Sequence, residues 1–214
     1  DVNNDNEVFI INPETFQSAN LSNAQGDDFE ITWAKDTTIA FASNRTGNYE
    51  IFTMDAYGNN LQQITNNEAN DKNPNWSPDN QKLVYESYRD GNWEIYIIDL
   101  SGKNELRLTN HDAGDSHPMW SPNGQWLSFT SNRDGSSDIY LIQENGSGLR
   151  RLTMDPGPDG DAIWSPNGRQ IAFRTWRNGN ADIYVINMDG SELRQITDTL
   201  VDEGIPAWSP DGQQ

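Results

Sequence analysis

Five acidic residues recur at one position of a segment that the chain repeats. Each lies five residues before a tryptophan, and the set is Asp28, Asp71, Asp115, Asp159 and Glu203. Carboxylate oxygens suit Ca²⁺, and carboxylates held close together raise one another's pKa unless a cation or hydrogen-bond donors compensate. If the repeats place these acids around one opening, they predict a calcium site. Alternatively, each acid caps its own loop by accepting backbone N–H bonds.

A second periodic set pairs arginines with acids that lie five residues further along the chain. The arginines are Arg45, Arg89, Arg133 and Arg177, and the acids are Glu50, Glu94, Asp138 and Asp182. Guanidinium and carboxylate groups form charge-assisted hydrogen bonds. We therefore expect each pair to brace its own hairpin or to join neighbouring repeats.

Four aromatic side chains fall at or beside polar turns: Tyr49, Tyr88, Trp93 and Trp176. Rigid aromatic side chains that are exposed on a rim supply contact area at low entropic cost, and they are frequent in binding sites. We therefore regard these four as candidate contacts for a peptide or a sugar.

Signatures of an enzyme are scarce. The sequence contains no cysteine, no Gly-x-Ser-x-Gly motif and no Gly-rich phosphate-binding loop. Its two histidines, His111 and His117, lie six positions apart in what reads as one loop between repeats. That is not an established spacing for metal ligands. The sequence predicts a protein without catalytic activity of its own.

The elements that must position these residues are short strands. A Trp-Ser-Pro motif begins at Trp76, Trp120, Trp164 and Trp208, each 44 residues after the last, and a weaker copy begins at Trp33. The unit around Trp76 reads as four strands, NPNWS, QKLVYES, EIYIID and RLT, separated by polar turns. Four antiparallel strands in a unit of this length are typical of a β-propeller blade. We predict an all-β fold with one β-propeller domain over residues 1–214.

The repeated order of WSPDG, IAF, RDG, DIYVIN and RLT resembles that of TolB-type β-propeller repeats, over nearly the whole chain. The resemblance implies a non-catalytic, exported module, periplasmic or extracellular, that binds a protein or polymer or takes part in assembly. Similar repeats stand beside the catalytic domains of prolyl peptidases. The alternative is therefore the propeller domain of a larger secreted hydrolase or lyase.

The two ends of the chain predict how the propeller closes. EVFIIN at residues 7–12 aligns with EIYIID at residues 94–99. Residues 1–32 would therefore complete a blade whose first strand is IPAWS, at residues 205–209. Such a mixed blade removes the free sheet edge and predicts five blades, or six if the native chain is longer. Its second strand is missing. We expect either that the native chain continues past Gln214 and supplies this strand, or that a strand from another copy does so and links molecules into an oligomer or filament.

Charge and hydropathy exclude some partners. The chain has 33 acidic and 14 basic residues, a formal net charge of -19, and such a surface repels nucleic acid and anionic membranes. No apolar run approaches the roughly 20 residues that a membrane-spanning helix needs. We therefore expect neither nucleic-acid binding nor membrane insertion.

Overall fold

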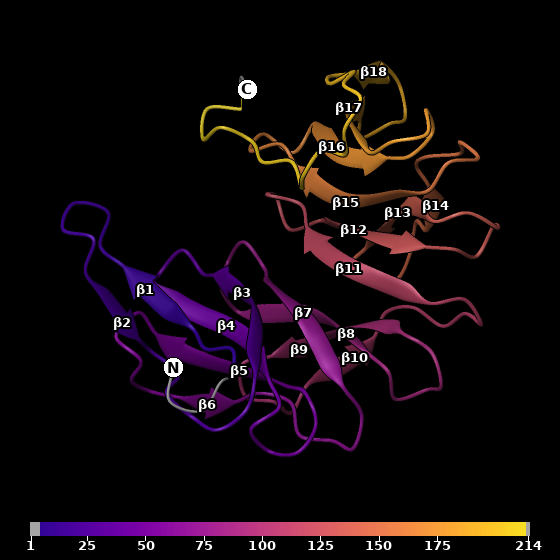
Figure 1. The fold of residues 1–214 in the computed structure, drawn as a ribbon. Helices are drawn as coiled ribbons and strands as arrows, with labels where there is room; N and C mark the ends of the chain where they lie inside the picture. Colours follow the sequence, from indigo (N-terminus) through magenta and orange to yellow (C-terminus); the bar gives the residue numbers. More distant parts are fainter. Residues whose placement is uncertain (1–4, 213–214) are drawn as a thin grey trace.

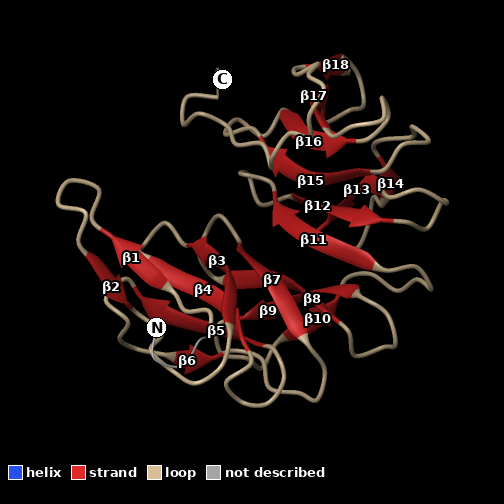
Figure 2. Cartoon of the chain, in the orientation of Figure 1, coloured by secondary structure: helices blue, strands red, loops and turns tan. Residues whose placement is uncertain are grey.

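The computed structural model describes residues 5–212 and contains four sheets of four antiparallel strands (Figures 1 and 2). The first strands of the sheets are β3 (Asp28–Trp33), β7 (Asp71–Trp76), β11 (Asp115–Trp120) and β15 (Asp159–Trp164). The second strands are β4 (Thr38–Ser43), β8 (Lys82–Ser87), β12 (Trp126–Ser131) and β16 (Gln170–Thr175). This regularity follows the repeat in the sequence.

The outer half of each sheet is equally regular. The third strands are β5 (Glu50–Asp55), β9 (Glu94–Asp99), β13 (Asp138–Gln143) and β17 (Asp182–Asn187). The fourth are β6 (Gln62–Gln63), β10 (Glu105–Arg107), β14 (Arg150–Arg151) and β18 (Arg194–Gln195). Neighbouring strands within each sheet are consecutive in the chain. Short polar turns make this possible, as at Gly124, whose φ of 72° suits a residue without a Cβ.

The hydrophobic core lies between successive sheets rather than in one centre. Ile51 and Ile64 of the first sheet cluster with Trp76, Tyr85 and other buried side chains of the second. Equivalent clusters join the second sheet to the third and the third to the fourth. Each sheet therefore depends on its neighbours to bury both of its faces, as expected for a repeat architecture.

Three of the five repeated tryptophans are buried between sheets, whereas Trp33 and Trp208 are not. Trp76, Trp120 and Trp164 are 7%, 5% and 5% exposed, whereas Trp33 is 51% exposed. Only β1 (Phe9–Ile11) and β2 (Ser18–Asn20) precede the first four-stranded sheet, and they form a two-stranded sheet of their own. Trp33 is exposed because no inner strand in the described residues covers it.

The predicted closure blade is not formed within residues 5–212. β1 and β2 pair with each other, as expected for the outer strands of a blade, but residues 205–209 form no strand. This segment lies instead along the fourth sheet, where Trp208 Nε1 donates a hydrogen bond to the Ile163 carbonyl at 3.0 Å. The sheets follow an open arc with β1 and β2 at one end and β17 and β18 near the other (Figure 1). The five-blade count stays a prediction.

Residues 5–212 contain no helix long and apolar enough to cross a membrane.

Candidate functional site

The first strand of every four-stranded sheet carries the same irregularity. Its pairing with the second strand shifts register in the middle. The third residue of each first strand has a positive φ: Glu30 (55°), Asn73 (50°), His117 (53°) and Asp161 (53°). Residues other than glycine adopt this conformation rarely, and bulges of this kind redirect a side chain. We call these four the bulge residues.

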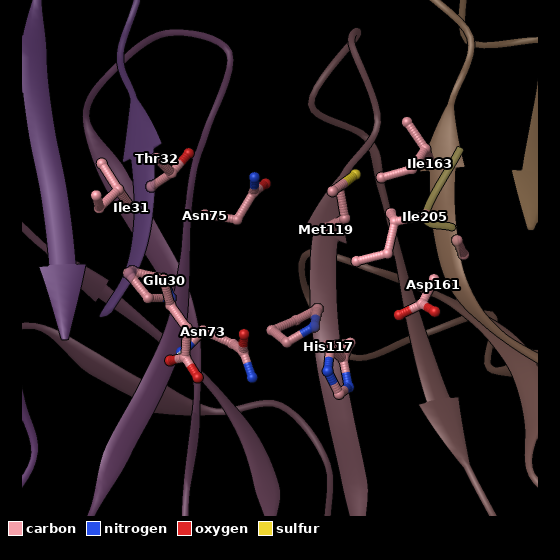
Figure 3. Close-up of a pocket in the computed structure, with 13 residues that line it drawn as sticks. Glu30, Ile31, Thr32, Asn73, Asn75, His117, Met119, Asp161, Ile163 and Ile205 are labelled. Atoms are coloured by element: carbon pink, nitrogen blue, oxygen red, sulfur yellow. The ribbon is translucent and has the colours of Figure 1, made fainter. Parts of the chain in front are cut away.

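The bulge residues line a cavity of about 340 Å³ on the inner side of the arc. All four first strands contribute to its wall, together with Ile205. The bulge residues lie at one level, and a second level holds Thr32 and Asn75 on one side and Met119 and Ile163 on the other (Figure 3). The cavity therefore offers a polar level next to a partly apolar one.

Hydrogen bonds connect the bulges from sheet to sheet. The Asn73 N–H donates to Glu30 Oε2 at 2.6 Å, and the His117 N–H donates to Glu86 Oε2 at 2.8 Å. Burial raises the pKa of the Glu86 carboxyl, while the His117 N–H and the nearby imidazole act in the opposite direction. The bulges at Asn73 and His117 thus each position a carboxyl group of the preceding sheet.

The second strands carry a different residue in each sheet at the position next to the bulge. The four equivalent residues there are Ala42, Glu86, Thr130 and Arg174. Arg174 Nη1 pairs with Asp161 Oδ2 at 3.0 Å, so its charge is compensated within the fourth sheet. The bulge residues, which line the cavity, likewise differ from sheet to sheet.

The five acids of the predicted calcium ring do not meet in this cavity. Four are buried and pair with an arginine of their own sheet: Asp28 with Arg45 at 3.0 Å, Asp71 with Arg89 at 3.5 Å, Asp115 with Arg133 at 2.7 Å, and Asp159 with Arg177 at 3.3 Å. Glu203 accepts a hydrogen bond from Thr199 Oγ1 at 2.9 Å. Among the described residues, no three His, Asp or Glu side chains form a group that could hold a metal ion.

The arginines have different partners from those that the sequence predicts. Each reaches back to the acid that begins the first strand and lies against two neighbouring aromatic rings, as Arg133 does at 5.5 Å from the Phe129 ring centre and 4.9 Å from that of Tyr140. The expected partner acids bind elsewhere; Glu50, for example, accepts a 2.6 Å hydrogen bond from Thr65 Oγ1. The predicted pairing was wrong because it followed distance along the chain, whereas strand pairing sets the actual neighbours.

One buried acid gives the fold a pH dependence that can be measured. Burial raises the pKa of Asp71 to about 6, against the lowering effects of Ser87, Arg89 and Asn67. An acid with a raised native pKa favours the folded state once it is protonated. As pH falls from 7.5 to about 4.5, the wild type should therefore gain on the order of 2–3 kcal/mol relative to Asp71→Asn. Urea unfolding of both proteins across this range measures the difference. A constant difference would contradict the shifted pKa.

The four candidate aromatic residues lie along the edge of the sheets at which the first strands begin. The Tyr49 and Trp93 carbonyls accept hydrogen bonds from the N–H groups of Asp71 and Asp115, both at 2.7 Å. Most of these rings already have partners within the chain. Tyr88 and Trp93 pack edge to face at 5.3 Å, Lys72 lies 4.2 Å from the Tyr49 ring centre, and Arg174 lies 4.6 Å from that of Trp176. Tyr88, at 48% exposed, is the most open of them.

Sequence reasoning missed the bulge residues. It placed His117 in a loop with His111, whereas His117 belongs to β11 and its side chain is exposed to the cavity. The available signal was a polar residue two positions after each of the first four repeated acids, different in every copy. The alternation of inward and outward side chains along a strand does not identify this residue, because the bulge interrupts that alternation.

Comparison with known proteins agrees with the fold. The family model described as the TolB beta propeller domain (PD40) matches residues 2–95 and 72–214. A 45-residue stretch is 44% identical to the Tol-Pal system protein TolB of Geobacter sulfurreducens, covering 21% of this chain and 10% of that protein.

Solved structures of similar proteins cover more of the chain. A TolB structure from Acinetobacter baumannii has a TM-score of 0.79 at 27% identity, over 97% of this chain and 52% of that one. A putative TolB from Agrobacterium tumefaciens also has a TM-score of 0.79, at 24% identity, over 92% and 76%. The chain therefore spans about a half to three quarters of these two structures and a tenth of the curated relative.

Proposed function

The chain belongs to the TolB beta propeller domain family, and from this premise we propose that it is a non-catalytic module that binds a polypeptide in the cavity on the inner side of the arc. A wall built from the first strand of each four-stranded sheet supports this reading. The observation that carries it is the repeated bulge, which directs a different polar side chain into the cavity from each sheet. A purely structural bulge would give no reason for this variation.

The charges around the cavity favour a basic ligand. Glu30 lines the cavity with a carboxylate, and the Glu86 carboxyl lies directly behind the His117 bulge. Asp161 and Arg174 compensate each other's charge. The net charge of -19 adds a long-range field of the same sign. The apolar side chains of Met119, Ile163 and Ile205 would receive aliphatic groups. A segment that combines lysine or arginine with aliphatic residues fits both levels.

The cellular setting of this function would be the periplasm or the outside of the cell. The support is the family and the similarity to a protein of the Tol-Pal system. The candidate aromatic residues lie along the edge at which the first strands begin, and Tyr88 is the most exposed of them. They would extend the contact area beyond the cavity.

Two labelled peptides of equal length test this proposal, one of alternating Lys and Leu and one of alternating Glu and Leu. We expect the wild type to bind the lysine peptide at least about tenfold more tightly at 150 mM salt, because complementary charges are then only partly screened. Fluorescence anisotropy measures both affinities. Equal affinities, or no binding of either peptide, would contradict the proposal.

A matched pair of variants separates the cavity from the general negative charge. Replacing all four bulge residues with glycine keeps the positive φ accessible and should weaken binding of the lysine peptide about tenfold. The control replaces four other residues with positive φ that do not line the cavity, Thr37, Asn60, Asn80 and Glu192, with glycine. The control should bind like the wild type. Equal loss in both variants would assign binding to nonspecific attraction.

A further inference from the structure

One of the four bulge residues can change its charge near neutral pH. His117 carries an imidazole, which ordinarily gains a proton between pH 8 and 5, whereas carboxylates ordinarily do so at lower pH. The other bulge residues are Glu30, Asn73 and Asp161, so the third sheet alone supplies a histidine. The imidazole is exposed to the cavity. A proton that it takes up therefore adds positive charge where a ligand would lie.

Contacts on both sides of the bulge set the position of this imidazole. The His117 backbone has a φ of 53°, and its N–H donates to Glu86 Oε2 at 2.8 Å. In the ring, Nδ1 lies 3.2 Å from Ser116 Oγ. Figure 3 shows the ring at the level of Asn73 and Asp161. The bulge therefore fixes the backbone from which the imidazole reaches the cavity.

Two charged groups lie near His117 on the second sheet. Glu86 of β8 lies directly behind the bulge and is 5% exposed. Lys72 is opposite Glu86 on β7, and its ammonium lies 4.2 Å from the centre of the Tyr49 ring. The Glu86 carboxyl is therefore the charged group of this sheet that acts most directly on the imidazole.

The other charged groups around His117 belong to the first, third and fourth sheets or lie at strand ends. Asp161 on β15 is paired with Arg174, and Glu30 on β3 accepts the Asn73 N–H at 2.6 Å. β12 contains no charged residue. The acids at the ends of β11 and of the strands in contact with it are Asp71, Glu94, Asp99, Asp115 and Asp159. Protonation of His117 therefore offsets the negative charge that Glu30 and Glu86 give to this part of the cavity.

We propose that protonation of His117 releases a basic ligand from the cavity, so that binding is tighter at pH 8 than at pH 5.5. This inference rests on the proposed function, because it concerns the same ligand at the same site. A protonated imidazole repels a lysine or arginine side chain at the bulge level. Within one partly screened cavity, a unit charge changes the affinity for a cation by about tenfold.

The lysine peptide tests this dependence by fluorescence anisotropy at pH 8.0 and pH 5.5, both at 150 mM salt. The dissociation constant of the wild type should rise at least about tenfold on acidification. His117→Asn should show a rise of less than about threefold. Asparagine is already the bulge residue of the second sheet and tolerates a positive φ. The control is His111→Asn, because His111 is the other histidine of the chain and does not line the cavity. This control should keep the tenfold rise.

Glu86 is the rival titrating group, because burial raises the pKa of its carboxyl. Glu86→Gln keeps an oxygen that can accept the His117 N–H, and it removes the proton-binding carboxylate. We expect this variant to retain at least about a fivefold rise in the dissociation constant between pH 8.0 and 5.5. A pH dependence that Glu86→Gln abolishes and His117→Asn leaves intact would overturn the proposal.

Proton linkage supplies a second readout, which does not rely on comparing affinities. Because linkage is reciprocal, binding of the lysine peptide to the wild type at pH 6.5 should release a few tenths of a proton per peptide. Lysine side chains ordinarily titrate far above this pH, so the proton comes from the protein. Titration calorimetry in two buffers of different ionisation enthalpy measures the release. Proton uptake, or the same release by His117→Asn, would contradict the proposal.

Failure of this inference is distinguishable from failure of the proposed function. If the lysine peptide does not bind the wild type at pH 8.0, the proposed function is wrong, and the inference falls with it. If the peptide binds equally well at pH 8.0 and 5.5, or if His117→Asn shows the same rise as the wild type, only the role of His117 is wrong. Near-ultraviolet circular dichroism at both pH values checks that each variant is folded.

Discussion

Replacing Arg133 with alanine is expected to lower the free energy of unfolding by about 3–5 kcal/mol, because it leaves a buried carboxylate without its counter-charge. Arg133 Nη2 donates to both Asp115 oxygens, at 2.9 and 2.7 Å, and the Asp115 side chain is 0% exposed. Arg133 Nε also donates to Ser131 Oγ at 3.0 Å. Urea unfolding followed by circular dichroism measures the loss.

A double-mutant cycle shows whether the loss comes from the pair. Asp115→Asn removes the charge that Arg133 compensates, so the double variant should lose at least about 2 kcal/mol less than the sum of the single variants. Arg133→Lys keeps the charge but lacks the planar guanidinium that lies against Phe129 and Tyr140, and its loss should be intermediate. Arg169, which is exposed, is the control, and its alanine variant should change stability by less than about 0.5 kcal/mol. Additive losses would show that the pair is not coupled.

Replacing Trp120 with alanine should cost about 3–5 kcal/mol, since it empties a large volume between the second and third sheets. Trp120 is 5% exposed and clusters with Leu108 and Leu127. Its backbone N–H donates to Asn75 Oδ1 at 2.9 Å, and the substitution keeps this hydrogen bond possible. The change in the free energy of unfolding, measured with denaturant, therefore reflects mainly the lost packing of the Trp120 side chain.

The first repeat supplies a matched control for this truncation. Trp33 occupies the same repeat position but is 51% exposed, so Trp33→Ala should cost less than half as much in the monomer. If Trp120→Ala is too unstable to purify, Trp120→Phe should retain part of the packing and lose about 1–2 kcal/mol. A loss below about 1 kcal/mol for Trp120→Ala would show that the interface between sheets does not depend on this residue.

The sequence predicts most of the secondary structure because the information is local. EIYIID and DIYVIN are rich in β-branched and aromatic residues, as is typical of strands, and polar turns with Gly or Pro separate the strands of each repeat. The structure places β9 and β17 on these segments. It also forms β1 and β2 within residues 7–22, as the alignment with the later repeat predicts. A strong period makes these inferences reliable, since each repeat supports the others.

The candidate site was predicted less well because it depends on contacts between strands. Pairing of Asp28 with Ser43 brings Arg45, two residues beyond, back to the Asp28 carboxylate. Glu50 is closer to Arg45 along the chain but begins the next strand, where it binds Thr65. Spacing in the sequence cannot distinguish these two partners, because both are compatible with one hairpin.

The sequence by itself determined the all-β class, the repeat, the positions of the strands and the family to which the chain belongs. Only the tertiary structure showed that four of the five repeated acids are buried ion-pair partners. It also showed that Glu30 and His117 face the cavity, and that β1 lies far from β17 along the arc. The physical reason is the distance along the chain over which each kind of interaction acts. Strand and turn preferences act over a few residues, whereas a bulge, an ion pair and a ring closure depend on how strands are paired and how sheets stack.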